Sequence, residues 1–376
     1  MRTTKLLAIA AVGAAALAAP ARAADAIQVG ALLAVTGPAS FLGAPKARTL
    51  ELLVEDLNAR GGIGGRRLQL VVKDTGGSPE KAISFAKQLI EEEGVVAIIG
   101  PSTSGETMAV KAVAEEGRTV LLSCAAAEVI VNPIARHVFK VAPKDSDAAE
   151  LIFRQMNGMG IARIGLLSFG KAGKEQVEKA AAAHGIQIAV NEVYDKAATD
   201  LTAEVTKLKA ANVEAILNWS IEPAQSIVLK NARQIGLSLP VFQSHGFANI
   251  QYAKAAGAAA EGVLFPAGRL VVADALADGD RQKPVLLAYK KAYESRYRED
   301  VSTFGGHGYD AFSILVKAIQ AAGTDREKVR SAVEGTRGFV GTAGVFDFSP
   351  ADHNGLGIDA FEMVTVRNGR FVPLPK

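Results

Sequence analysis

The sequence predicts an α/β fold of two doubly wound lobes joined by crossover strands, with a ligand cleft between them. Short apolar strand-like runs alternate with helical patterns from residue 27 to about residue 270. This alternation is typical of parallel sheets covered by helices on both faces. The alternation restarts after residue 141, and a chain of 376 residues is longer than one hydrophobic core usually serves. Two lobes are therefore expected.

The first half opens with a strand at residues 27–35 and an amphipathic helix at 45–60, which stops at Gly61 and Gly62. Ser78 and Pro79 supply a cap and a first-turn proline for the next helix, which ends at residue 93. A third helix ends at residue 116. The other strands predicted in this half are 68–73, 95–100, 119–123 and 138–141.

The second half repeats the pattern. Helices at 145–157 and 174–184 alternate with strands at 163–168 and 186–193, and further units run to Trp219 and Phe242. A strand at 263–265 precedes the last helical patterns, which are 285–298, 309–322 and 326–334. Asn368-Gly369 predicts the turn of a closing hairpin. Since no low-complexity linker separates the halves, we expect the chain to cross between lobes directly and more than once.

The first residues have the features of a secretory signal peptide. Arg2 and Lys5 precede an apolar run of about fourteen residues, and the small-residue pattern Ala21-Arg22-Ala23 follows it. That run is too short to span a bilayer of about 30 Å, and no later run exceeds it. We expect cleavage after residue 23 and a soluble periplasmic protein. Cys124 is the only cysteine, so neither a lipid anchor nor an intramolecular disulfide is expected.

The charge of the chain argues against two classes of partner. The cations within residues 1–23 account for the whole formal charge of +3, so the remaining chain is neutral. A neutral chain gives no electrostatic footprint for nucleic acid or for an anionic membrane surface. We expect neither as a partner.

Four short motifs resemble landmarks of one family, the periplasmic binding proteins of the leucine/isoleucine/valine type. They are VTGP at 35–38, NARGGIGG at 58–65, IGPSTSG at 99–105 and RQIGL at 233–237. Together they span most of the chain in the family's order. The resemblance implies a monomer that captures a small molecule and delivers it to the membrane permease subunits of an ABC importer.

The resemblance also implies three crossover strands, near residues 141–144, 265–269 and 339–345. Lobe 1 is then expected to comprise residues 24–142 and 268–341, and lobe 2 residues 143–267 and 342–376. The ligand is expected in the cleft between the lobes, which close about a hinge.

Thr103 and Ser104 are candidate carboxylate-binding residues. They follow a predicted strand and open a helix, where unpaired amide donors and the helix dipole favour an anion. Glu106 completes a capping box with Thr103, so an alternative is that the hydroxyls only cap the helix. Members of the family hold the ligand's carboxylate at this turn, and the resemblance therefore favours binding.

The resemblance places a second ligand loop at Ala125, Ala126 and Ala127, with Ala127 where the family has a threonine. It places His245 where the family has the acid that receives the ligand's ammonium group. A histidine cannot replace a permanent anion. These differences favour a carboxylate without an α-ammonium group, although a lone histidine can also be a structural residue.

The remaining candidates are apolar or aromatic. Phe41 and Leu42 lie on the first cleft loop, and Phe304 corresponds to an aromatic wall residue of the family. Ile221 or its neighbour Trp219 corresponds to a second-lobe wall residue, although Trp219 could equally pack in the core. Such a set suits a planar or apolar ligand body.

Catalytic alternatives have little support. The pattern G-x-G-x-x-A at 306–311 has no parallel strand before it, and the chain has no G-x-S-x-G elbow, P-loop or paired-histidine metal spacing. We expect no enzyme activity, cofactor or metal. The favoured ligand is an aromatic or other non-amino carboxylic acid. The alternatives are a binder of branched-chain or other amino acids, a ligand-sensing regulator of the same fold, and an exported hydrolase.

Overall fold

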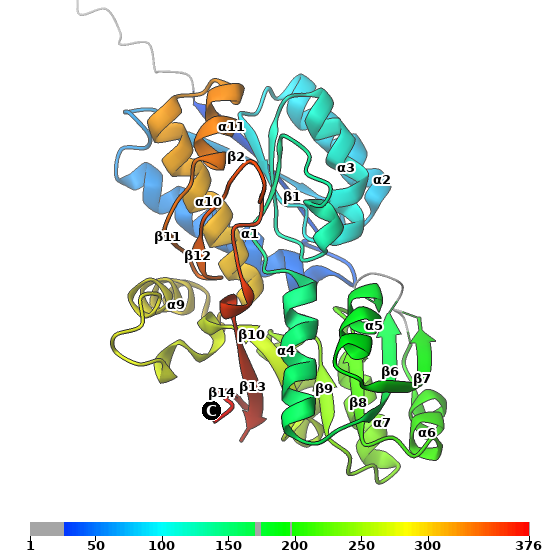
Figure 1. The fold of residues 1–376 in the computed structure, drawn as a ribbon. Helices are drawn as coiled ribbons and strands as arrows, with labels where there is room; N and C mark the ends of the chain where they lie inside the picture. Colours follow the sequence, from blue (N-terminus) through cyan, green and yellow to red (C-terminus); the bar gives the residue numbers. More distant parts are fainter. Residues whose placement is uncertain (1–25, 170–173, 196–197, 376) are drawn as a thin grey trace, which may run out of the picture.

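The computed structural model describes residues 26–169, 174–195 and 198–375. The expected signal peptide, residues 1–23, lies outside the described residues. The chain forms two α/β lobes, each built on its own sheet (Figure 1). The predicted fold class is confirmed. Within the described ranges, no helix is both long enough and apolar enough to cross a membrane.

The first lobe contains a five-stranded parallel sheet with the order β2-β1-β3-β4-β5. Its strands are β1 (Ile27–Leu33), β2 (Leu68–Asp74), β3 (Ala97–Ile99), β4 (Val120–Ser123) and β5 (Val138–Lys140). The strand order reverses between β1 and β3. In sheets of this kind, ligands bind beyond the carboxyl ends of the strands at that point.

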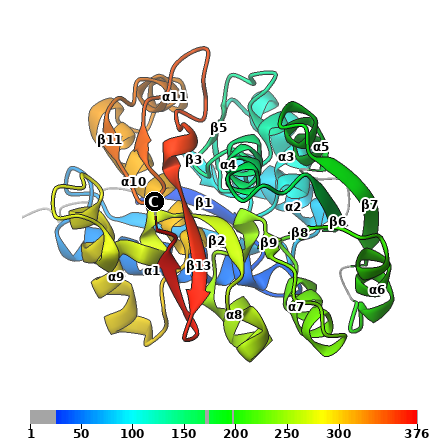
Figure 2. The ribbon, with the colours of Figure 1, turned by 60° about the horizontal axis from the view of Figure 1, so that its bottom comes forward.

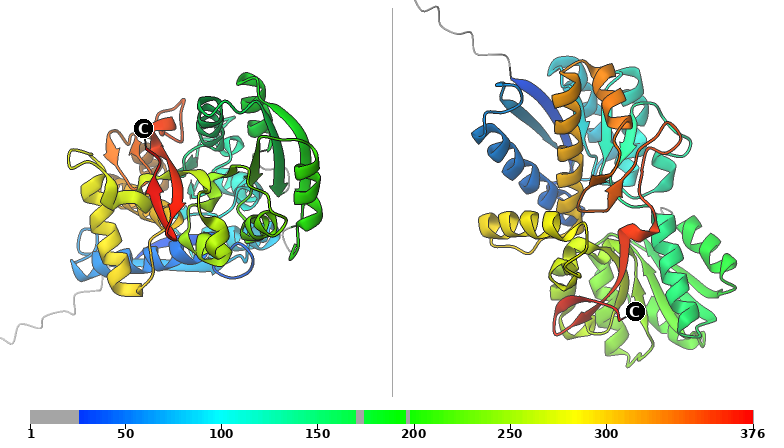
Figure 3. Two further views of the ribbon diagram at one scale, coloured as in Figure 1. Left: turned by 90° about the horizontal axis from the view of Figure 1, so that it is seen from below. Right: turned by 60° about the vertical axis from the view of Figure 1, so that its left-hand side comes forward.

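Helices cover both faces of this sheet. On one face α1 and α10 pack together with α11, and on the other face α2 and α3 pack as a pair (Figure 3). The helices of this lobe are α1 (Ser40–Ala59), α2 (Pro79–Lys87), η1 (Gln88–Glu92), α3 (Ser104–Glu116), η2 (Glu128–Ile130), α10 (Thr303–Ala322) and α11 (Arg326–Glu334). A small ribbon of β11 (Phe339–Val340) and β12 (Val345–Phe346) packs beside them, followed by η6 (Ile358–Ala360).

The second lobe contains a seven-stranded sheet with the order β14-β13-β10-β9-β8-β6-β7. Its parallel strands are β6 (Arg163–Phe169), β7 (Gln187–Tyr194), β8 (Ala215–Trp219), β9 (Val241–Gln243) and β10 (Leu264–Gly268). The antiparallel hairpin of β13 (Phe361–Arg367) and β14 (Arg370–Pro373) closes one edge (Figure 2). Asn368 and Gly369 both have positive φ at its turn, as the sequence predicted.

The helices around the second sheet are α4 (Asp145–Gly158), α5 (Lys174–Ala183), α6 (Thr202–Ala210), α7 (Ala224–Gln234), α8 (Ile250–Ala256) and the short η3 (His245–Phe247) and η4 (Gly257–Ala260). After β10 the chain forms η5 (Arg269–Ala275) and α9 (Lys283–Tyr297), which pack on each other beside the junction of the lobes (Figure 1).

Helix α1 begins five residues before the predicted start at Pro45. Proline lacks the N–H that would pair with the carbonyl four residues earlier, which belongs to Phe41. That carbonyl instead accepts a hydrogen bond from Asn249 Nδ2 of the second lobe, at 3.2 Å. The tertiary structure therefore supplies the partner that the helix cannot.

Helix α10 begins at Thr303, six residues before the predicted start, so the glycine-rich segment 304–308 is helical. The glycines permit close packing. A Cβ atom at Gly305 would lie 2.6 Å from Tyr289 Oη, and one at Gly306 would lie 2.5 Å from Thr342 Oγ1. The pattern G-x-G-x-x-A therefore lies inside a packed helix.

We propose a lobe division that follows the packing of the chain. Strand β5 belongs to the first sheet and α4 packs on the second, while β10 belongs to the second sheet and α10 packs on the first. Phe346, Phe348 and Leu356 pack in the core of the first lobe, beside β1 and β3. This favours a third crossing between Leu356 and Phe361, later than the expected 339–345.

Candidate functional site

A cavity of about 330 Å³ lies between the lobes, beyond the carboxyl ends of the strands. Its lining comes from the segments that follow all five strands of the first sheet, from the ends of β6, β8 and β9 in the second lobe, and from α10. All but one of the predicted site residues line it, namely Leu42, Thr103, Ser104, Ala125, Ala126, Ala127, Trp219, Ile221, His245 and Phe304. The fold thus brings together residues that are far apart in the sequence.

Phe41 is the exception. Its ring stacks on that of Tyr252 at a centroid distance of 4.7 Å, and Tyr252 in turn donates its hydroxyl hydrogen to the carbonyl of Ile221 at 2.8 Å. Phe41 joins the lobes beside the cavity but does not line it. Its neighbour Leu42 does.

Thr103 and Ser104 differ in what their hydroxyls do. Thr103 caps α3, because its Oγ1 accepts a hydrogen bond from the Glu106 backbone N–H and donates to Glu106 Oε2 at 2.6 Å. Ser104 Oγ accepts a hydrogen bond from the Ala127 backbone N–H at 3.2 Å, which leaves its own hydrogen for another acceptor. At the N-terminus of α3, Ser104 is therefore the freer donor for an anion.

A buried lysine holds the loop after β4 through hydrogen bonds to backbone carbonyls. Lys140 Nζ donates to the carbonyls of Ala126, at 3.1 Å, and Ala142, at 2.8 Å. Burial lowers the pKa of Lys140 to about 7. Asp145 also lines the cavity; it accepts hydrogen bonds from the backbone N–H groups of Glu128 and Ser146, and burial raises the pKa of its carboxyl.

Trp219 and His245 form part of the second-lobe wall. Trp219 is 5% exposed and packs in the core of its lobe while also lining the cavity, so the two expectations for it are compatible. The His245 ring lies edge-on to it at 5.7 Å. Burial lowers the pKa of His245 to about 4, so the imidazole is neutral near pH 7.

The loops that carry these residues are locked together. Ser244 Oγ donates to the Ser220 carbonyl at 2.7 Å and accepts from the Gly246 backbone N–H at 3.1 Å. A Cβ atom at Gly246 would lie 2.4 Å from the Ser220 carbonyl oxygen. Glycine is therefore required for the close approach that positions His245.

Sequence reasoning missed two acids in the cavity wall. Glu222 and Asp145 are 6% and 5% exposed, and both line the cavity. Glu222 follows the end of β8, and loops at the carboxyl ends of parallel strands are where such residues gather, so its position could have been found. His307 and Phe169 also line the cavity and were not among the candidates.

Cys124 is enclosed at the base of the cavity. Its Sγ lies 3.9 Å from the carbonyl oxygens of Leu122 and His307, and burial raises the pKa of the thiol to about 11. A thiol that stays protonated is a poor nucleophile. Cys124 therefore acts as a packing residue, in the core cluster of the first lobe.

Comparison with known proteins identifies the family. A periplasmic binding protein family matches residues 26–370. The chain belongs to this family. The "Leucine-, isoleucine-, valine-, threonine-, and alanine-binding protein" of Pseudomonas aeruginosa is 26% identical to this periplasmic binding protein over 330 residues, which is 83% of each chain. The Leu/Ile/Val-binding protein of Escherichia coli is 26% identical over 64% of this chain and 67% of its own.

Solved structures agree with the family. An extracellular ligand-binding receptor from Rhodopseudomonas palustris HaA2 is 26% identical, with a TM-score of 0.87 over 93% of this chain and all of the receptor. A branched-chain amino acid transporter substrate binding protein from Streptococcus pneumoniae, solved with isoleucine, has a TM-score of 0.83 at 23% identity over 92% of this chain and 98% of its own. The second likeness shows the same fold. The family predicted from the four motifs is confirmed, and it is one of binding proteins for ABC transport.

Proposed function

We propose that this periplasmic binding protein captures a small amino acid between its lobes and delivers it to the permease of an ABC importer. The observation that carries the proposal is the charge pattern of one cavity. The hydroxyl donor of Ser104 and the N-terminus of α3 lie on its first-lobe side, and the carboxylates of Glu222 and Asp145 also line it. A zwitterion needs both kinds of partner.

The carboxylate end rests on α3. A helix N-terminus presents unpaired backbone N–H groups and the positive end of the helix dipole. Ser104 adds a hydroxyl donor, and a hydrogen bond to a charged group contributes about 1.5–3 kcal/mol. No ion pair with a cation is needed for an anion in such a position.

The ammonium end changes the expectation drawn from sequence. The preference for an aromatic or other carboxylic acid without an amino group assumed that the cavity has no acidic residue, because His245 stands where the family has one. Glu222 and Asp145 remove that argument, because either carboxylate can offset the cost of burying an ammonium group. The relatives named above also have amino acids as their ligands.

A non-amino carboxylic acid remains a second candidate on one observation. The cavity is walled by Leu42, Trp219 and Phe304, which suit a flat apolar body. The relatives named above give this candidate no support. We expect either ligand to be bound without being chemically changed, since the thiol in the cavity wall, Cys124, stays protonated.

The test is isothermal titration calorimetry with L-leucine and 4-methylpentanoate, which differ only in the ammonium group. We expect L-leucine to bind at least tenfold tighter, and Glu222→Gln or Asp145→Asn to reduce that ratio. Glu192→Gln is the control, because Glu192 pairs with Lys207 outside the cavity. A panel of L-isoleucine, L-valine, L-threonine, L-alanine, benzoate and cinnamate completes the experiment. Equal binding of the matched pair, or binding of benzoate and cinnamate alone, would contradict the proposal. Mass spectrometry of the mixtures tests for turnover, which a hydrolase requires.

A further inference from the structure

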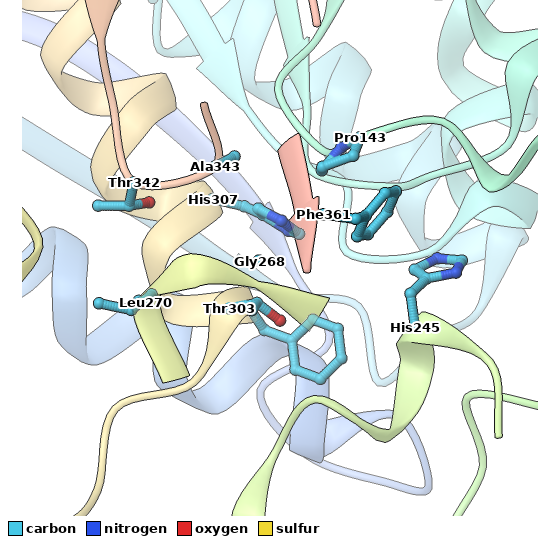
Figure 4. A pocket seen from close by; sticks show the side chains of 10 residues that line it. Pro143, His245, Gly268, Leu270, Thr303, His307, Thr342, Ala343 and Phe361 are labelled. Atoms are coloured by element: carbon cyan, nitrogen blue, oxygen red, sulfur yellow. The ribbon is translucent and has the colours of Figure 1, made fainter. Parts of the chain in front are cut away.

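Two imidazoles in the cavity wall are left unexplained by the capture of a zwitterion. His245 extends from η3 in the second lobe, and His307 extends from α10, which packs on the first. Both line the main cavity and a small side cavity of about 10 Å³. In Figure 4 the two rings extend from different elements, and the ring of Phe361 lies between them in this view.

Neither imidazole is satisfied at its Nδ1 atom. Each Nδ1 is enclosed and has no hydrogen-bond partner among the described residues. Burial lowers the pKa of His245 to about 4 and holds that of His307 well below its ordinary value, so both rings are neutral near pH 7. A neutral imidazole has one donor and one acceptor nitrogen. A buried N–H group without a partner is rarer than a buried acceptor without one. The unpaired Nδ1 is therefore taken as the acceptor nitrogen, and the proton is placed on Nε2 in both residues.

The surroundings favour an acceptor opposite these donors. Two fully buried lysines, Lys46 and Lys140, lie close enough to lower the pKa of His307. Lys46 Nζ makes one long hydrogen bond, 3.5 Å to the Ser102 carbonyl, and lies 5.6 Å from the centre of the Phe304 ring. The positive potential of these groups and two N–H donors suit an oxygen with free lone pairs.

We propose that His245 and His307 form a subsite for a hydrogen-bond-accepting oxygen on the body of the ligand, such as a hydroxyl or an amide carbonyl. This inference rests on the proposed function, because it concerns the same cavity. It narrows the proposed ligand class from small amino acids in general to those that carry a further hydrogen-bond acceptor. Trp219 and Phe361 flank His245 at ring distances of 5.7 and 5.8 Å, so a methyl group in this position leaves the imidazole donors unpaired.

The experiment uses two matched pairs in which a methyl group is replaced by a hydroxyl. L-Valine is compared with L-threonine, and 4-methylbenzoate with 4-hydroxybenzoate, by calorimetric titration of the full mature chain. We expect the hydroxyl member of whichever pair binds to be about tenfold tighter, the size of one net hydrogen bond.

Variants of His307 identify the nitrogen. The amide nitrogen of glutamine can reach the position of Nε2, so His307→Gln is expected to keep most of the preference. Asparagine places its amide near the position of Nδ1, so His307→Asn is expected to lose the preference. His184→Gln is the control, because His184 pairs with Glu150 outside the cavity. If thermal unfolding shows that a His307 variant is not folded, His245→Gln and His245→Asn replace that pair.

The outcomes separate the two proposals. Equal affinity within a pair that binds, or tighter binding of the methyl member, overturns the subsite alone. An unchanged preference in both asparagine variants also overturns it. Binding of neither pair overturns the subsite, and the titration with L-leucine and 4-methylpentanoate then decides the proposed function. Tighter binding of 4-hydroxybenzoate, with no binding of either amino acid, supports the subsite and overturns the amino-acid assignment.

Discussion

The side-chain amide of Asn249 donates a hydrogen bond to the backbone carbonyl of Phe41, across the two lobes. Pro45 deprives this carbonyl of its partner within α1. Asn249 has a second role, since its Oδ1 accepts from the Gln251 backbone N–H and caps α8. One residue thus couples the start of α1 to the start of α8.

The two roles can be separated by substitution. Asn249→Ser keeps a capping oxygen but removes the amide donor to Phe41, so we expect a loss of about 1 kcal/mol in the free energy of unfolding, since a half-buried carbonyl loses its partner. Ligand affinity should fall as well, because the lost bond joins the lobes. Urea denaturation and calorimetric titration measure the two effects. Unchanged values for both would show that the interlobe bond contributes nothing.

Ser104 and Thr103 should separate binding from stability. Ser104→Ala removes the hydroxyl donor, and we expect affinity for the ligand to fall about tenfold or more while the protein stays folded, although the Ala127 backbone N–H loses its acceptor. Thr103→Ala removes the cap of α3, and we expect the free energy of unfolding to fall by about 0.5–2 kcal/mol. Calorimetric titration and urea denaturation of both variants provide the measurement. A folded Ser104→Ala protein with wild-type affinity would reduce Ser104 to a structural residue.

Lys140 should make stability depend on pH. Its pKa is lowered to about 7 by burial, while in the unfolded chain it returns to its ordinary value near 10.5. Between these values the unfolded state binds more protons, so the free energy of unfolding should rise with pH, by at most about 1.4 kcal/mol per unit. Urea denaturation of wild type and Lys140→Met between pH 7 and 10 tests this. The variant should show the smaller slope, and parallel curves would contradict the assignment.

We expect export to remove the first 23 residues, because the charged start, apolar run and small-residue site have the pattern of a cleavable signal peptide. Intact-mass measurement of the exported protein should give a chain that begins near Ala24. A mature chain that still begins at Met1 would contradict the expectation.

The local sequence pattern predicted helix boundaries correctly where the residues that start or stop the helix are its own neighbours in the chain. Residues 326–334 were predicted as a helix and form α11, where Asp325 caps the first turn. The capped start of α3 at Thr103 and Ser104 was predicted for the same reason, because a strand followed by a capped helix is a local signal. The starts of α1 and α10 were missed, because Asn249 and the packing of Tyr289 against Gly305 come from distant parts of the chain.

By itself the sequence determined the alternation of strands and helices, the two sheets and the family, since apolar periodicity, caps and short motifs are written locally along the chain. Only the tertiary structure decided which charges share the cavity. Glu222, Asp145, His245 and His307 come from separate elements and meet because the strands of two sheets end at one junction. Distance in space, and not distance along the chain, decides which groups a ligand contacts. The sequence comparison at position 245 alone therefore could not show that Glu222 and Asp145 supply acids to the cavity wall.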